Sequence, residues 1–184
     1  MSITMTKEER PIGISILSVL HIAGGVFGTI ITLVLIAQFK NNQEAIQNLS
    51  AMGWPPIWII IVMAYYMALA ITSGILMWKK SKWGWYLGTF FYMNSVARNA
   101  NALLVLPGLF NAMSPEELNN MTHSPSHFYV KHSGRVVIHF LILLYFFKSN
   151  VQSYFPLGKT KRWKPMLIEL TLCLVVTAIL TFVI

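Results

Sequence analysis

GWYLGTFFYMNSVARNANALLVLPGL (residues 84–109) and YVKHSGRVVIHFLILLYFF (residues 129–147) are the two segments from which the rest of the chain is interpreted. Both are apolar over most of their length, yet the first contains Arg98 and the second contains Lys131 and Arg135. A charged side chain inside a membrane costs about 2.5–3.5 kcal/mol on insertion scales, so it marks a site whose partner must be found. The pair therefore predicts a cationic site within a helical membrane protein.

The composition of the whole chain agrees with a membrane protein. Of its 184 residues 55% are hydrophobic and 11% are charged, and its mean hydropathy is +0.59. Soluble domains carry about 25% charged residues. The net charge of +8 would suit a nucleic-acid partner, but the basic residues gather in short runs beside apolar segments, as the positive-inside rule describes. We therefore expect an all-α integral membrane bundle with no nucleic-acid partner.

Apolar segments near the length of about 20 residues that a spanning helix needs recur along the chain. They predict five spans in one transmembrane domain covering residues 1–184, at 11–39, 57–78, 84–109, 129–147 and 165–184. In the loop 110–128, Ser114-Pro115-Glu116-Glu117 is typical of a helix start and predicts a short surface helix. The clean apolar part of the fourth span is short, so that helix takes in either Lys131–Arg135 or Lys148–Asn150.

The basic runs predict the orientation of these spans. With five spans, Lys7, Arg10, the Lys79–Lys82 turn and the Lys148–Lys164 loop fall on one side of the membrane. By the positive-inside rule this side is the cytoplasm, so the N-terminus is cytoplasmic and the C-terminus is outside.

Small and polar residues at steps of three and four predict the faces on which the helices pack. In the first span these residues are Ser18, His21, Gly25, Gly28 and Thr32, and Gly24 and Gly28 form a Gly-xxx-Gly pair; in the second they are Ala64, Ala68 and Thr72; in the fifth they are Glu169, Cys173, Thr177 and Thr181. We interpret His21 and Glu169 chiefly as packing residues, with a polar or proton-carrying role as the alternative.

The cationic site is expected in the outer half of the membrane. Arg98 and Arg135 lie at similar depths in neighbouring spans, and the further candidate residues are Lys131, Asn94 and Asn101. Arginine's planar fork suits phosphate or carboxylate, and the asparagines add neutral donors. A purely structural alternative has the basic side chains reaching ordinary headgroups, with Arg98 bonded to a backbone carbonyl or to Glu116.

The remaining titratable residues predict no cofactor and no metal. His21 and His139 fall near mid-membrane on different helices, where a histidine pair can ligate haem or relay protons, but no further pairs support this. His123 and His127 are separated by Pro125, which argues against a metal on one helix. The chain shows no catalytic triad, zinc helix, Walker loop or acidic pair, so we expect no enzyme.

Arg10-Pro11-Ile12-Gly13-Ile14, Trp83-Gly84-Trp85-Tyr86-Leu87 and YFFKSNVQSYF at 145–155 resemble a broad set of small uncharacterised prokaryotic membrane proteins. Those proteins enter the first span through Arg-Pro-x-Gly and close a span with a Tyr-rich segment. The resemblance covers most of residues 10–155 and leaves out the fifth span. It implies a helical bundle in a prokaryotic plasma membrane, and it implies no activity.

The function expected from the sequence is non-enzymatic, with an outer-leaflet cationic pocket that binds an anionic lipid headgroup or a small anion. The expected partners are membrane lipids. One alternative is an accessory or regulatory subunit of a larger membrane complex, in which other membrane subunits contact the small-residue faces. Another is a small oligomeric transporter that uses the same cationic pocket.

Overall fold

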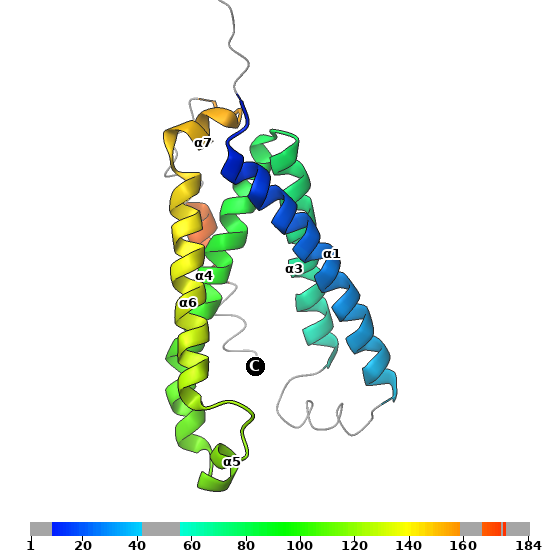
Figure 1. Cartoon of the computed structure of the whole chain (residues 1–184), viewed down its shortest axis with the longest axis vertical. Helices are drawn as coiled ribbons and strands as arrows, with labels where there is room; N and C mark the ends of the chain where they lie inside the picture. The colour runs from blue at the N-terminus through cyan, green and yellow to red at the C-terminus, as the bar shows by residue number, and fades with distance from the viewer. Residues whose placement is uncertain (1–8, 42–55, 159–166, 174, 176–184) are drawn as a thin grey trace, which may run out of the picture. The chain divides into compact units, whose positions relative to one another are not determined.

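The computed structural model describes residues 9–41, 56–158, 167–173 and 175, and every regular element within these ranges is helical. The elements are α1 (Ile12–Asn41), α3 (Pro56–Trp78), α4 (Lys82–Ala112), α5 (Pro115–Asn119), α6 (Pro125–Phe146) and α7 (Ser149–Tyr154) (Figure 1). Residues 167–173 are helical as well. The all-α class predicted from the sequence is confirmed for this part of the chain.

Two of the described helices are long and apolar enough to cross a membrane, Ile12–Phe39 within α1 and Ile57–Trp78 within α3. They coincide with the first two predicted spans and indicate that the protein belongs to a membrane. α4 and α6 are interrupted by polar and charged residues, so the third and fourth spans remain predictions. Most of the fifth predicted span, including Thr177 and Thr181, lies outside the described residues.

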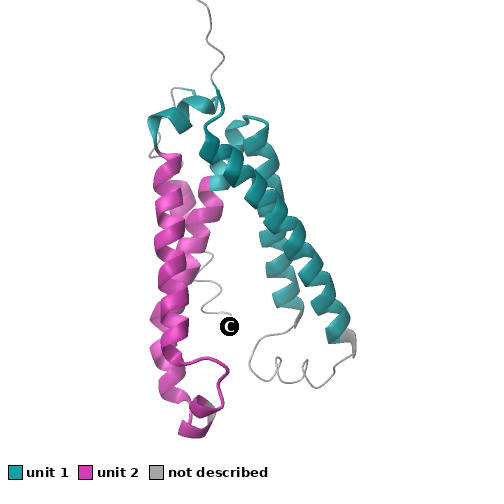
Figure 2. Ribbon diagram, viewed as in Figure 1, with its two compact units in different colours: residues 1–88, 148–159, 184 teal, residues 89–147, 160–183 magenta. Residues whose placement is uncertain are grey.

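The chain divides into two compact units, and the single transmembrane domain expected from the sequence stays a prediction (Figure 2). Unit 1 contains α1, α3, the start of α4 up to Gly88, and α7. Unit 2 contains the rest of α4, α5, α6 and the helical residues 167–173.

In unit 1, α1 packs on α3 through the polar face predicted on the first span. Ser18, His21 and Thr32 are all buried. Nδ1 of His21 lies 2.7 Å from Oγ of Ser73, which itself donates a hydrogen bond to the carbonyl oxygen of Ala70 at 3.0 Å. His21 is therefore a buried hydrogen-bonded packing residue, the first of the two roles that the sequence suggested.

Glycines allow the two helices to approach closely, but they are not all the glycines that the sequence suggested. A Cβ added to Gly25 would lie 2.5 Å from Cγ1 of Ile71, and one added to Gly28 would collide with Met67. A Cβ on Gly24 would meet nothing within 4 Å. The Gly24–Gly28 pair is thus wrong as a packing motif, because Gly24 is rotated out of the interface and Gly25 takes its place.

The small-residue stripe predicted on α3 is not the face that contacts α1. Ala64, Ala68 and Thr72 are exposed, and the residues buried on this helix include Ser73 and Gly74. Both registers place small residues at helical spacing, so the sequence pattern did not distinguish them. A Cβ on Gly74 would lie 2.9 Å from the carbonyl oxygen of Ser18, which shows that Gly74 faces α1.

The turn between α3 and α4 is a Schellman motif that ends α3. The N–H of Ser81 donates to the carbonyl oxygen of Leu76 at 3.0 Å, and that of Lys80 donates to Met77 at 3.2 Å. Lys80 occupies the left-handed position of this motif with φ of 55°. Gly84 lies against the backbone of Leu76 and Met77, so α4 starts in direct contact with the end of α3.

In unit 2, the helix bounds refine the predicted ones. α4 continues through Pro107 to Ala112, beyond the expected end of the third span. α6 ends at Phe146 and therefore takes in Lys131–Arg135, which decides between the two alternatives for the fourth span. The short surface helix is present as α5.

The sequence predicts a loop for the basic segment between the fourth and fifth predicted spans. In the structure, part of this segment is helical. This helix, α7, buries Val151, Gln152 and Tyr154 in unit 1. The rest of the segment, which holds Lys159, Lys161, Arg162 and Lys164, lies outside the described residues.

Candidate anion-binding site

Two polar contacts join α4 to α6 and set their register. Oγ of Ser95 lies 2.6 Å from Nδ1 of His139, and Nδ1 of His132 donates to Oδ1 of Asn99 at 2.9 Å. Nδ2 of Asn99 in turn donates to the carbonyl oxygen of Ser95 at 2.7 Å. The contacts pair a later residue of α4 with an earlier residue of α6, so the helices are antiparallel.

Counted along the helices from these contacts, the two arginines come to about the same level. Arg98 lies between Ser95 and Asn99 on α4, and Arg135 lies between His132 and His139 on α6. Each arginine follows a contact residue by three positions, which is a rotation of about 60° from it around the helix. Because the helices run in opposite directions, equal rotations bring both side chains to the same side of the hairpin.

The charges confirm that the basic residues lie near one another. Arg98, Lys131 and Arg135 are all close enough to His132 for their charges to act on it. Arg98 and Arg135 act in the same way on His139. We call Arg98, Lys131 and Arg135 the cationic cluster; all three side chains are exposed.

The two asparagines predicted for the site are less accessible than the cations. Asn94 is buried and Asn101 is half-buried. Asn99, which was not among the residues predicted for the site, binds His132 directly. Sequence reasoning missed Ser95 and the pairing of Asn99 with His132. Their spacing could have indicated this contact. Ser95 and Asn99 are four residues apart and His132 and His139 are seven apart, so each pair lies on one face of its helix.

Glu169, one of the acidic residues considered as a counterion, has a partner on α4 away from the arginines. Oε1 of Glu169 accepts a hydrogen bond from Oγ1 of Thr89 at 3.1 Å, and both side chains are buried. Thr89 precedes Arg98 by nine residues, which is about 14 Å along the helix. Glu116 is exposed on α5, and the side chain of Glu117 lies outside the described residues. Glu169 therefore has a packing role inside unit 2, and Cys173, one turn further on, is buried as well.

The other histidines lie against serines or against each other in the described part of the chain. His21 belongs to unit 1 and His139 to unit 2, and each lies against a serine. The rings of His123 and His127 are stacked, with centroids 4.3 Å apart. No group of three or more potential metal ligands occurs in the described part of the chain.

No family model, curated protein or solved structure matches this chain.

Proposed function

We propose that the chain is a non-enzymatic membrane protein whose α4–α6 hairpin binds an anionic lipid headgroup or a small anion. The observation that supports this best is the position of Arg98 and Arg135 at one level and on one side of the hairpin. Two exposed guanidinium groups on one side of the hairpin give that side a positive charge, which favours the binding of an anion. Phosphate and carboxylate are the anions that match the planar fork of arginine.

The hydrogen-bonded residues between the helices support the same proposal. Ser95, Asn99, His132 and His139 hold the two helices in one register, so the arginines do not depend on each other for their positions. A site whose groups are fixed before binding loses less entropy when the ligand arrives.

We further propose that the hairpin spans a prokaryotic plasma membrane in a five-span bundle with a cytoplasmic N-terminus. In this topology the cationic cluster faces the outer leaflet. The support comes from the basic residues beside α1 and α3, the two helices that are apolar enough to span.

Native mass spectrometry of the protein in mild detergent tests the proposed ligand. The wild type is compared with the double variant Arg98→Ala/Arg135→Ala and with the matched control Arg98→Lys/Arg135→Lys, which keeps both charges. We expect an anionic lipid or metabolite on the wild type, loss of it from the alanine variant and partial retention by the lysine variant. If the wild type and the alanine variant carry the same ligands, the cluster is structural and the proposal fails.

One observation favours a second candidate, an accessory subunit of a membrane complex. Ala64, Ala68 and Thr72 form a small-residue stripe that remains exposed on α3, and such stripes let another helix approach closely. This candidate predicts a stable co-purifying membrane protein that is lost in Ala68→Phe and kept in Val34→Phe, a substitution at an exposed position of α1. A lone monomer of the wild type under mild extraction contradicts it.

A further inference from the structure

A second group of cations lies in unit 1, where α1 begins and α3 ends. The guanidinium of Arg10 is held by two hydrogen bonds: Nε donates to Oη of Tyr154 at 3.0 Å and Nη2 donates to the carbonyl oxygen of Trp78 at 2.8 Å. Its Cζ also lies 4.2 Å from the centre of the Trp78 ring. These contacts use two of the guanidinium N–H groups and leave the others for a ligand.

Lys80 approaches the same tyrosine from a different element. Its Nζ lies 5.3 Å from the centre of the Tyr154 ring. Arg10 and Lys80 therefore converge on one side chain, Arg10 at the hydroxyl and Lys80 at the ring. Tyr154 thus brings two cations from different elements into one neighbourhood of unit 1.

The backbone of Lys80 gives independent support for a role of its side chain. At φ of 55° it occupies the position of the Schellman motif that glycine usually takes, because a Cβ is strained there. Retained strain of this kind is associated with functional positions. A glycine would end α3 equally well but would carry no charge.

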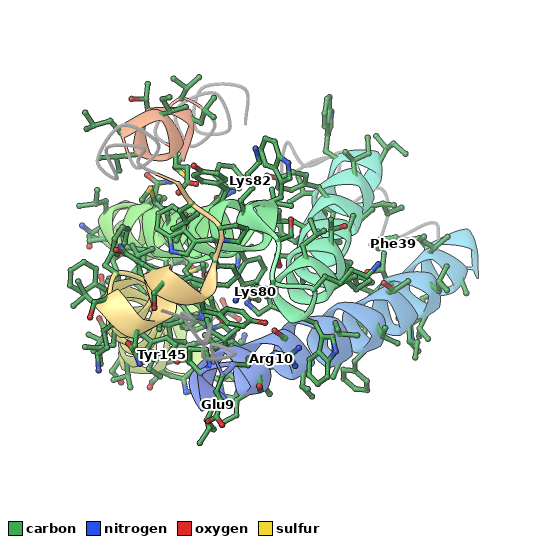
Figure 3. The ribbon with its side chains drawn as sticks, turned by 90° about the horizontal axis from the view of Figure 1, so that it is seen from above. Glu9, Arg10, Phe39, Lys80, Lys82 and Tyr145 are labelled. Atoms are coloured by element: carbon green, nitrogen blue, oxygen red, sulfur yellow. The ribbon has the colours of Figure 1, made fainter. Side chains whose placement is uncertain are left out.

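The surroundings of this group are those of a membrane surface. Arg10 lies two residues before α1 and Lys80 two residues after α3, the two helices that are apolar enough to span. In Figure 3, the view from above, Arg10 and Lys80 are labelled near each other, while Lys82 lies further away. Trp78 and Trp83 are 45% and 57% exposed, as is typical of side chains at the level of the headgroups.

We infer that Arg10 and Lys80, held by Tyr154 and Trp78, bind the phosphate group of an anionic phospholipid in the leaflet at this end of α1 and α3. Basic residues next to spanning helices attract anionic lipids, and arginine donates two hydrogen bonds to one phosphate. The site lies in unit 1 and uses none of the cationic cluster on α4 and α6. It does not depend on the function proposed above.

The test is a titration of phosphatidylglycerol into the purified protein in detergent with phosphatidylcholine as the background lipid. Native mass spectrometry measures the lipid retained by the wild type, by Lys80→Gly and by Lys79→Ala. The glycine variant removes the charge and the backbone strain together, so its melting temperature should not fall. Lys79→Ala removes an equal charge from an exposed neighbour in the same turn.

We expect Lys80→Gly to weaken phosphatidylglycerol retention about five-fold, with Lys79→Ala close to wild type. Equal losses in both variants would show general charge attraction and overturn the site, and so would unchanged retention in Lys80→Gly. Binding of inorganic phosphate to the wild type as tightly as phosphatidylglycerol would overturn the lipid as its occupant. The Arg98→Ala/Arg135→Ala variant should keep this lipid, which separates failure of this site from failure of the cationic cluster.

Discussion

Oγ of Ser95 on α4 lies 2.6 Å from Nδ1 of His139 on α6, so a polar pair joins the two helices at the level of the arginines. A second pair, Asn99 with His132, lies one turn further along α4. Hydrogen bonds within a protein contribute about 0.5–1.5 kcal/mol each. Because each bond contributes little free energy, the main effect of the two pairs is to determine which residues of α4 and α6 face each other.

A double-mutant cycle on Asn99→Ala and His132→Ala should give a coupling free energy of about 0.6–1.7 kcal/mol. The physical reason is that each single substitution removes the same hydrogen bond. The coupling is measured from unfolding in mixed micelles. A control cycle pairs Asn99→Ala with Ser133→Ala, because Ser133 is exposed on α6; its coupling should be near zero. Equal couplings in the two cycles would contradict a direct bond.

Gly25→Ala should destabilise the α1–α3 pair by about 1–3 kcal/mol, whereas Gly24→Ala should not. The added Cβ at position 25 would lie 2.5 Å from Ile71 Cγ1 and 3.2 Å from the backbone oxygen of Met67, and that oxygen cannot rotate away. At position 24 the same methyl group meets open space. Thermal unfolding in detergent compares the two variants, and a larger loss at position 24 would show that the helices pack in another register.

Much of the fold followed from the sequence because it depends on local periodicity. The apolar runs predicted α1 and α3 to within two residues at the ends that the structure describes, and the polar face of α1 was identified from Ser18, His21 and Thr32. What failed was the choice between neighbouring registers. Gly24 and Gly25 differ by about 100° around the helix, and only the partner helix decides which one faces it.

The candidate site was only partly predictable from the sequence. Depth along two helices is a matter of counting residues, so the matched level of Arg98 and Arg135 was accessible from the sequence. The rotation of each helix is not. Ser95, Asn99, His132 and His139 occupy the faces between α4 and α6, and the arginines lie beside that contact. The convergence of Arg10 and Lys80 on Tyr154 joins residues up to 144 positions apart, which no local pattern reveals.

Thr89→Val should destabilise unit 2 by about 1–3 kcal/mol, because it leaves the buried Glu169 carboxyl without the hydroxyl that donates to it. The double variant Thr89→Val/Glu169→Leu should recover most of this loss, since removal of both partners leaves no unsatisfied group. Unfolding free energies in detergent measure both effects. If the double variant is less stable than Thr89→Val, the carboxyl has a further stabilising partner.

Replacement of glycine by alanine should have opposite effects on stability at Gly84, near the start of α4, and at Gly134, inside α6. At Gly84, in the first turn of α4, the atoms that a Cβ would meet belong to the backbone of Leu76 and Met77, so no side chain can move aside. Gly84→Ala must therefore separate the end of α3 from the start of α4. We expect it to lower the melting temperature strongly.

Gly134 lies in the interior of α6, and a Cβ there would meet nothing within 4 Å. Gly134→Ala should stabilise the helix by about 0.5–1 kcal/mol, because alanine loses less backbone entropy than glycine on folding. Thermal unfolding of the two variants in one detergent gives the comparison. A fall in melting temperature for Gly134→Ala would show that another helix contacts α6 at this position, while an unchanged value for Gly84→Ala would show that the Schellman turn does not hold α4 against α3.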